Sequence, residues 1–153
     1  MRNKWTFRWF ELCRLLESWS EDRSRKTGCV IVDDRQVLLS IGWNGFARGV
    51  HDLEYRHDRP EKYKWFEHAE RNAIYNAASK GIELRGATMY HRWFPCADCA
   101  RSIIQSGIST LICIEPDWDD PIWGEDFKAV RVMFDEAGIE THFVEGIEPP
   151  KQQ

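Results

Sequence analysis

Apolar residues recur at helical spacing near the start of the chain and gather into β-type runs further on. Between residues 4 and 19 they fall on one side of a helix, at Trp5, Trp9, Leu12, Leu16 and Trp19. Two runs rich in β-branched and aliphatic residues follow, at 29–33 and 37–42, and they flank a short polar turn. The pattern therefore predicts a helix with one face on the core, followed by a β-hairpin.

Helices and strands are expected to alternate from His68 onward. The first of these helices begins near His68 and is stopped by Gly81, a residue that suits the end of a helix. The elements predicted after it are a strand at 87–94, a helix ending before Gly107, a buried strand at 109–115, a long helix at 125–138 and a short strand at 141–144. Such alternation predicts an α/β fold, a three-layer α/β/α sandwich around a mixed five-stranded sheet. The polar and aromatic stretch 51–66 has no clean period and is expected to be a solvated loop.

Length and composition are those of one globular domain. The chain has 153 residues, of which 42% are hydrophobic and 30% charged. We expect a single domain over residues 1–146 and a loose tail over 147–153, where two prolines stand. The sequence has no apolar run long enough for a membrane span and no secretory signal, so a cytoplasmic protein is expected.

Charge and cysteine content narrow the partners further. The formal net charge is −4, whereas a protein that follows a polynucleotide backbone generally carries a basic stripe, so a small-molecule substrate is expected rather than a nucleic acid. Of the five cysteines, Cys13, Cys29 and Cys113 lie inside apolar runs, where a buried free thiol is the usual state. A disulfide framework is therefore not expected.

The other two cysteines belong to a pattern suited to a metal. His68 is followed 28 residues later by Cys96, and Cys99 comes three positions after that. If a helix begins at Pro95, the two cysteines lie on one face of its first turn, where the helix dipole favours thiolates. One imidazole and two thiolates supply three of the four ligands of tetrahedral zinc, and an open fourth position is typical of a catalytic site.

Glu70 completes this pattern, because a zinc-activated water needs a nearby group to take and return protons. We expect His68 in the opening turn of its helix and Glu70 turned toward the water rather than the metal. The combination of H-x-E with P-C-x-x-C resembles that of the zinc nucleobase deaminases. A redox pair or a structural zinc site is the alternative, and His91 is the candidate for the fourth ligand that a structural site would need.

A longer resemblance covers about residues 18–112. The runs SEDRSRKTGCVIVD, GWNGFARG, RHDRPEKY, HAERNAI and FPCADCARSIIQSGI are similar to those of the deoxycytidylate (dCMP) deaminase family of the cytidine deaminase superfamily. The H-x-E and P-C-x-x-C motifs are common to the superfamily, whereas the runs GWNGFARG and RHDRPEKY are more selective and favour dCMP. The resemblance implies a cytidine deaminase-like fold and one Zn²⁺ per chain, held by His68, Cys96 and Cys99. It also implies a hydrolase acting on the C–N bond of a cyclic amidine, in which Glu70 helps convert dCMP to dUMP and ammonia by attack of zinc hydroxide at C4.

The same resemblance suggests substrate contacts. Asn44 matches an asparagine that contacts the nucleotide, and Ala69 would offer its backbone to the edge of the base. Basic residues of the loops would meet the phosphate, namely Arg23, Arg25, Lys26 and Arg48, of which Arg25 and Lys26 are favoured. Trp93 would stack on the base or narrow the pocket. Related deaminases often complete their sites across subunits, so a homo-oligomer is expected.

Three departures from the family keep other substrates open. The chain has Ala47 where proline is common, Arg92-Trp93 in place of smaller residues, and a new acidic and aromatic segment at 115–124, which could form a subunit interface. One alternative is a deaminase of cytidine, guanine or another small heterocycle. A tRNA adenosine deaminase is a further alternative, which the acidic composition disfavours. A zinc-binding module without catalysis is the last, and it predicts that Glu70 is dispensable.

Overall fold

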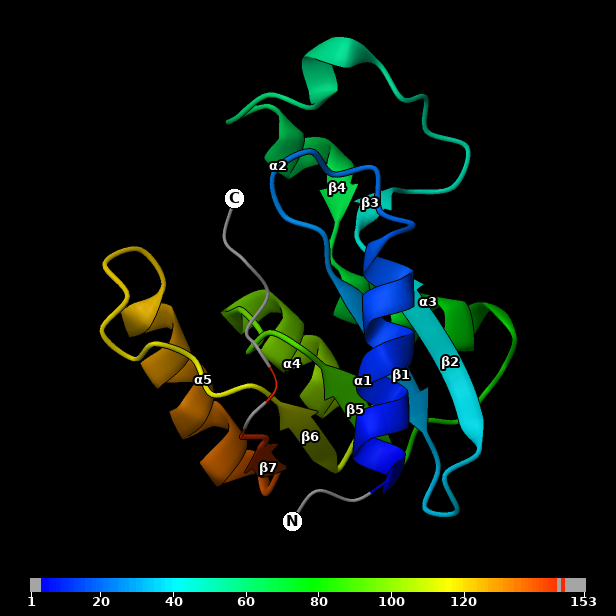
Figure 1. The fold of residues 1–153 in the computed structure, drawn as a ribbon, viewed down its shortest axis with the longest axis vertical. Coiled ribbons are helices and arrows are strands. Elements are labelled where there is room, and N and C mark those ends of the chain that lie inside the picture. The colour runs from blue at the N-terminus through cyan, green and yellow to red at the C-terminus, as the bar shows by residue number, and fades with distance from the viewer. Residues whose placement is uncertain (1–3, 146, 148–153) are drawn as a thin grey trace.

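A mixed five-stranded sheet forms the centre of the protein, as the computed structural model shows over residues 4–145 and 147. The strands lie in the order β2-β1-β5-β6-β7 (Figure 1). Their bounds are β1 Gly28–Val32, β2 Leu38–Trp43, β5 Thr88–His91, β6 Thr110–Cys113 and β7 Glu140–Phe143. Strand β1 pairs antiparallel with both β2 and β5, whereas β5, β6 and β7 run parallel. The predicted hairpin and the mixed sheet are both confirmed.

Helices cover both faces of the sheet, which gives the three predicted layers. Helix α1, Lys4–Glu17, packs on one face through Phe10, Cys13 and Leu16, against Val30 and Val32. The opposite face carries α3 (Ala69–Ser79), α4 (Ala97–Gln105) and α5 (Gly124–Ala137). Alternate residues of β1 point to the two sides, as the period of two in a strand requires.

Two glycines let helices approach the sheet closely, one on each face. A Cβ on Gly28 would lie 2.4 Å from the carbonyl oxygen of Cys13, in α1. A Cβ on Gly42 would lie 2.4 Å from the carbonyl oxygen of Ala69 and from the backbone nitrogen of Ala73, in α3. The start of α3 therefore rests directly on the backbone of β2.

The region between β2 and α3 departs from the solvated loop expected at 51–66. It holds β3 (Gly45–Phe46) and β4 (Phe66–Glu67), which pair as a two-stranded sheet, with a 3₁₀ turn at Glu54–Arg56 and α2 at Lys62–Trp65 between them. Within this region His57 pairs with Asp52 and packs against the rings of Phe46 and Phe66. Such short elements, held by tertiary contacts, leave no periodic pattern in the sequence.

Several further expectations can be compared with the described residues. Cys13, Cys29 and Cys113 are buried free thiols, as predicted. None of the described helices is long and apolar enough to cross a bilayer. Most of the predicted tail, 147–153, lies outside the described residues, so its looseness and the domain boundary at 146 remain predictions, as does the cytoplasmic location.

Candidate metal centre and active site

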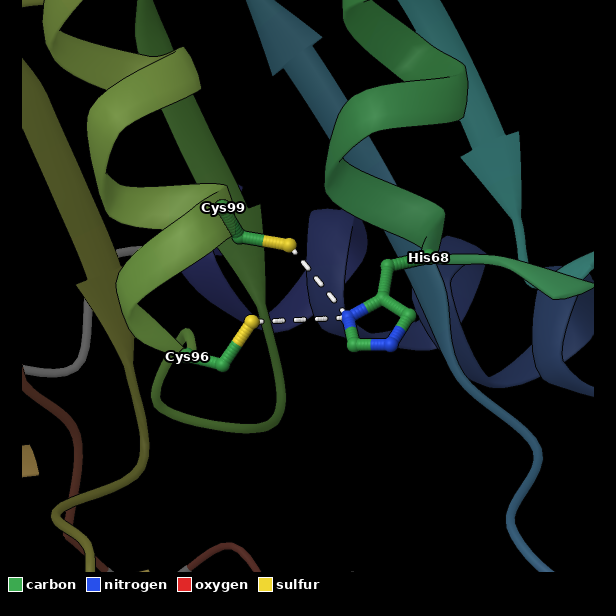
Figure 2. A group of neighbouring side chains, drawn as sticks. All are labelled: His68, Cys96 and Cys99. Atoms are coloured by element: carbon green, nitrogen blue, oxygen red, sulfur yellow. Dashed lines mark hydrogen bonds between the residues drawn. The ribbon is translucent and has the colours of Figure 1, made fainter. Parts of the chain in front are cut away.

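The two metal motifs come together at the starts of α3 and α4. His68 is the N-cap of α3 and has extended backbone, so it precedes the helix instead of lying in its first turn as predicted. Cys96 is likewise the N-cap of α4, and the helix begins at Ala97, two residues later than expected from Pro95. Cys99 still lies three positions on, so both sulfurs face the same point. Figure 2 shows the two sulfurs converging on the imidazole of His68.

The separations between these side chains fit a zinc ion. The Nδ1 atom of His68 lies 3.6 Å from the Cys96 sulfur and 3.4 Å from the Cys99 sulfur (Figure 2). Bonds of about 2.3 Å to sulfur and 2.0 Å to nitrogen at tetrahedral angles place ligand atoms about 3.5 Å apart. One ligand atom from each of the three residues lies within 4.8 Å of the others, and this is the one such group of three found in the described part of the chain. His68, Cys96 and Cys99 could therefore hold one zinc ion.

The pKa values of the two candidate thiol ligands are shifted in opposite directions. A hydrogen bond with Cys99 lowers the pKa of Cys96 to about 5, and the contact with His68 acts in the same direction. The hydrogen bond to Cys96 and burial together raise the pKa of Cys99. Zinc binds the thiolate form of cysteine, so the lowered pKa of Cys96 favours binding, whereas Cys99 would give up its proton when the metal binds.

Side chains beyond the three candidate ligands hold them in place. The Nη1 atom of Arg71 lies 3.7 Å from the Cys99 sulfur, and Arg71 also pairs with Glu67. Burial opposes the charge of Arg71, but the neighbouring Cys99 and Glu67 outweigh it and raise the pKa of the guanidinium. Asp126, in α5, accepts a 2.9 Å hydrogen bond from the backbone nitrogen of Ala97 and so caps α4 beside Cys96. Partners of this kind orient metal ligands.

Glu70 lies in the first turn of α3, one residue beyond Ala69, with a side chain that is almost fully buried. Its Oε1 atom is 3.4 Å from Nδ1 of His91, which is the last residue of β5. Burial works to raise the pKa of Glu70, but the imidazoles of His91 and His68 outweigh it, and the pKa is lowered. A carboxylate is thus held beside the group that could bind zinc. His91, considered as a fourth metal ligand, contacts Glu70 instead.

Asn44 has a different environment from the one its expected role suggests. Its Oδ1 accepts a 2.8 Å hydrogen bond from the backbone nitrogen of Thr27, and its Nδ2 donates to the carbonyl of Arg25 at 2.7 Å and to Asp22 at 3.2 Å. Both amide hydrogens and one lone pair are therefore used within the protein. Asn44 fixes the backbone of residues 22–27, from which Arg25 projects.

The remaining substrate candidates fall into two groups. The guanidinium of Arg25 lies over the ring of Trp93, 4.3 Å from its centroid, so these two residues are brought together. Lys26, on the same loop, is exposed, whereas Arg23 pairs with Glu54. Arg48 donates to Asn76 on α3, about 12 Å along the helix from His68. The structure therefore does not bring Arg48 to the metal centre.

The segment 115–124 serves the fold as well as the site. Trp118 packs edge-on against Phe94 and also contacts Phe143, so this new aromatic residue extends the core. Asp120 accepts hydrogen bonds from the backbone of Ile122 and Trp123 and lies near enough to Arg25 for their charges to interact. The loop thus brings the Asp120 carboxylate within electrostatic range of the Arg25 guanidinium.

The sequence analysis assigned no role to two residues that hold the loop 22–27, Asp22 and Lys62, although both stand in the quoted runs. Lys62 lies within the run RHDRPEKY, and its Nζ atom is 2.9 Å from both carboxylate oxygens of Asp22 and 2.6 Å from the Ser24 hydroxyl. Both Lys62 and Asp22 are buried. A lysine between a glutamate and a tyrosine carries no sign of burial in the sequence, and its partner is 40 positions away.

Comparison with known proteins agrees with this geometry. The family model of the cytidine and deoxycytidylate deaminase zinc-binding region matches residues 3–115. An uncharacterized deaminase of Aliivibrio fischeri is 39% identical over 92% of this chain and 94% of its own. Human deoxycytidylate deaminase is 34% identical over 78% of this chain and 68% of the human protein. The deoxycytidylate deaminase of phage T2 is 51% identical over 69% of this chain and 57% of the phage protein.

Solved structures share the fold. The dCMP deaminase of cyanophage S-TIM5, in complex with dCMP and dUMP, superposes with a TM-score of 0.73 at 22% identity and covers 94% of this chain and 99% of that one. The predicted cytidine deaminase-like fold is therefore confirmed. The zinc-binding region and the relatives together establish the family and its cofactor, one zinc ion per chain. This chain belongs to the deoxycytidylate deaminase family, whose members are zinc-dependent hydrolytic deaminases.

Proposed function

We propose that this protein converts dCMP to dUMP and ammonia. The observation that carries the proposal is the buried carboxylate of Glu70, the residue two positions after His68, placed beside a group of three side chains that fits zinc. The choice of dCMP is supported by relatives named deoxycytidylate deaminases, which are 34–51% identical to this chain.

His68, Cys96 and Cys99 would hold the metal, and zinc in that position supplies a water activated for attack at neutral pH. Glu70 would accept a proton from that water and deliver it to N3 of the cytosine ring. The water oxygen would bond to C4, and the same carboxylate would take the remaining proton from that oxygen and pass it to the amino group, whose bond to C4 breaks to release ammonia. The balance is dCMP plus water to dUMP plus ammonia, and Glu70 ends the cycle as it began.

Arg25 and Trp93 would bind the nucleotide. The loop 22–27 supplies Arg25 and Lys26 as cations for the phosphate, and Asn44 would act mainly by holding that loop. The half-buried ring of Trp93 and the backbone of Ala69 would border the base. Arg48, which donates to Asn76, is not included in this proposed site.

The proposal is tested by ammonia release from the zinc-loaded protein with dCMP, CMP, deoxycytidine, cytidine, guanine and adenosine at one concentration. We expect dCMP to be preferred over deoxycytidine by at least about tenfold, because a phosphate bound by charged donors contributes about 1.5–3 kcal/mol. Faster turnover of an unphosphorylated compound would reject dCMP while leaving the family intact.

The role of Glu70 is tested by Glu70→Gln, which keeps the size of the side chain but cannot exchange protons. We expect the variant to retain one zinc ion per chain, measured by elemental analysis, and to lose at least about a hundredfold in kcat. A variant that binds zinc and keeps wild-type turnover would show that Glu70 is not the acid/base of the reaction.

A further inference from the structure

Strand β5 ends in a buried histidine, His91, whose ring contacts Glu70. His91 is the last residue of β5, and its side chain is only 2% exposed. Its neighbour Glu70 is 5% exposed at the side chain. Two ionisable side chains so thoroughly removed from water need defined polar partners.

The protonation of the imidazole follows from its contacts. Nδ1 of His91 lies 2.8 Å from the carbonyl oxygen of Trp93. A carbonyl oxygen only accepts hydrogen bonds, so Nδ1 carries the proton and donates it. The same Nδ1 lies 3.4 Å from Oε1 of Glu70. The N–H thus points at the backbone of Trp93, and the carboxylate of Glu70 lies close beside it at ion-pair distance.

The other side of the ring makes no comparable contact. Nε2 of His91 is buried and has no hydrogen-bond partner among residues 4–145 and 147. A buried polar atom without a partner weakens the folded state. Packing and stability therefore do not account for an imidazole at this position, and its useful atom is Nδ1.

We propose that His91 is a positioning residue for catalysis, whose Nδ1–H, aimed by the Trp93 carbonyl, holds the Glu70 carboxylate in one orientation beside the metal ligands. This inference rests on the proposed role of Glu70. It also links the acid/base to Trp93, because the imidazole that lies beside the carboxylate is hydrogen-bonded to the backbone of the residue on which Arg25 stacks.

Three substitutions of His91 test the roles of Nδ1 and Nε2 separately. The amide nitrogen of asparagine can take the place of Nδ1, whereas that of glutamine reaches the place of Nε2, and leucine fills the space with no donor. We expect His91→Asn to keep kcat for dCMP within about threefold of wild type, whereas His91→Gln and His91→Leu lower kcat about 10- to 100-fold with KM changed less than about threefold, as a small misplacement of a reacting group requires.

Readouts besides turnover make the test decisive. All variants should bind one zinc ion per chain, and in the zinc-free wild-type protein the ¹⁵N shifts of His91 should report a protonated Nδ1. Equal kcat for the asparagine and glutamine variants, or a loss that appears in KM alone, would overturn the proposal, and this pair decides even if the leucine variant does not fold. Failure of the inference is distinct from failure of the proposed function: in the first case Glu70→Gln is inactive while all His91 variants are active, and in the second Glu70→Gln is itself active.

Discussion

Arg25 and Trp93 form the contact on which recognition of a phosphate would depend at the level of single residues. The guanidinium lies 4.3 Å from the centroid of the indole ring, within the range of a cation–π interaction. Burial and the nearby Arg59 lower the pKa of Arg25, and the carboxylate of Asp120 opposes them. A guanidinium keeps its charge in such surroundings, which a lysine would not do as reliably. The stack fixes a cation at the side of the proposed base pocket.

This contact gives a prediction for substitution of Arg25. We expect Arg25→Ala to lower kcat/KM for dCMP about 10- to 100-fold and to leave kcat/KM for deoxycytidine within about twofold, because only dCMP offers the phosphate. The measurement is steady-state deamination of both substrates. Arg23→Ala is the matched control, because Arg23 is on the same loop as Arg25 but is exposed and paired with Glu54. This variant should change neither kcat/KM value by more than about twofold. An equal loss with both substrates would show that Arg25 does not read the phosphate.

The candidate metal ligands were the part of the site that could best be predicted from the sequence. The spacing of His68, Cys96 and Cys99 was sufficient to bring them together, because caps and first turns at the starts of two helices have nearly fixed geometry. Asn44 and His91 could not be placed in the same way. The hydrogen bonds of Asn44 reach back 17 to 22 positions, and His91 meets a carboxylate on another element. A single sequence does not encode such long-range pairings in any periodic pattern.

At the level of elements, the contact between β2 and α3 sets the distance between the sheet and α3, the helix that His68 precedes. Gly42 lies against the backbone of Ala69 and Ala73, and Gly28 lies in the same way against α1 on the opposite face. Backbone atoms cannot move aside as side chains can, so an added methyl group must push the helix away. The two glycines are thus equivalent in packing, but only Gly42 contacts α3, the helix whose start carries His68 and Glu70.

This difference predicts unequal effects of two alanine substitutions. We expect both Gly42→Ala and Gly28→Ala to lower the free energy of unfolding by about 1–3 kcal/mol. Only Gly42→Ala should also weaken zinc affinity and turnover, by about tenfold or more, since it displaces His68 and Glu70 from Cys96 and Cys99. Chemical denaturation and zinc competition titrations measure the two effects. Equal zinc affinity in both variants would contradict the idea that Gly42 sets the metal geometry.

The loop 22–27 is joined to α2 by a buried ion pair, and this makes its stability dependent on pH. Burial works to raise the pKa of Asp22, but hydrogen bonds from Lys62 and from Ser24 outweigh it and lower the pKa. Because the carboxylate is more acidic in the folded than in the unfolded protein, its contribution to stability is complete above pH about 4 and is lost as pH falls through the lower folded value.

We therefore expect Asp22→Asn to remove the part of the pH dependence of unfolding free energy that lies below pH about 4. Lys62→Met should be more severe, lowering stability by about 3–5 kcal/mol at pH 7, because it leaves a buried carboxylate without its cation. In that variant the free energy of unfolding should rise, not fall, as the pH is lowered from 7. Denaturation curves between pH 3 and 7 for the three proteins test the sign, and parallel curves would rule out this account of Asp22.

Across the whole molecule, the order of layers could be predicted from the sequence, but the short elements between β2 and α3 could not. Alternating helices and strands after His68 have few ways to pack, and the parallel strands β5, β6 and β7 follow from the helices that connect them. The small sheet of β3 and β4, by contrast, depends on rings of Phe46 and Phe66 that meet only in the folded chain. The expected homo-oligomer remains a prediction.

The zinc ion would add a further link between two helices that already pack against each other. His68 belongs to the start of α3 and the two cysteines to the start of α4, so a metal at this point ties together two helices of one layer (Figure 2). A ligand that binds only the folded protein stabilises it by about 4 kcal/mol when present at a thousand times its dissociation constant. Removal of zinc from a protein saturated to this degree should therefore lower the melting temperature by about 8–16 °C, since a domain of about 150 residues loses about 2–4 °C per kcal/mol. Thermal unfolding with and without a chelator measures the change, with Cys99→Ala as the control that should show no response to added zinc; an unchanged melting temperature of the wild-type protein on chelation would mean that α3 and α4 are held without the metal.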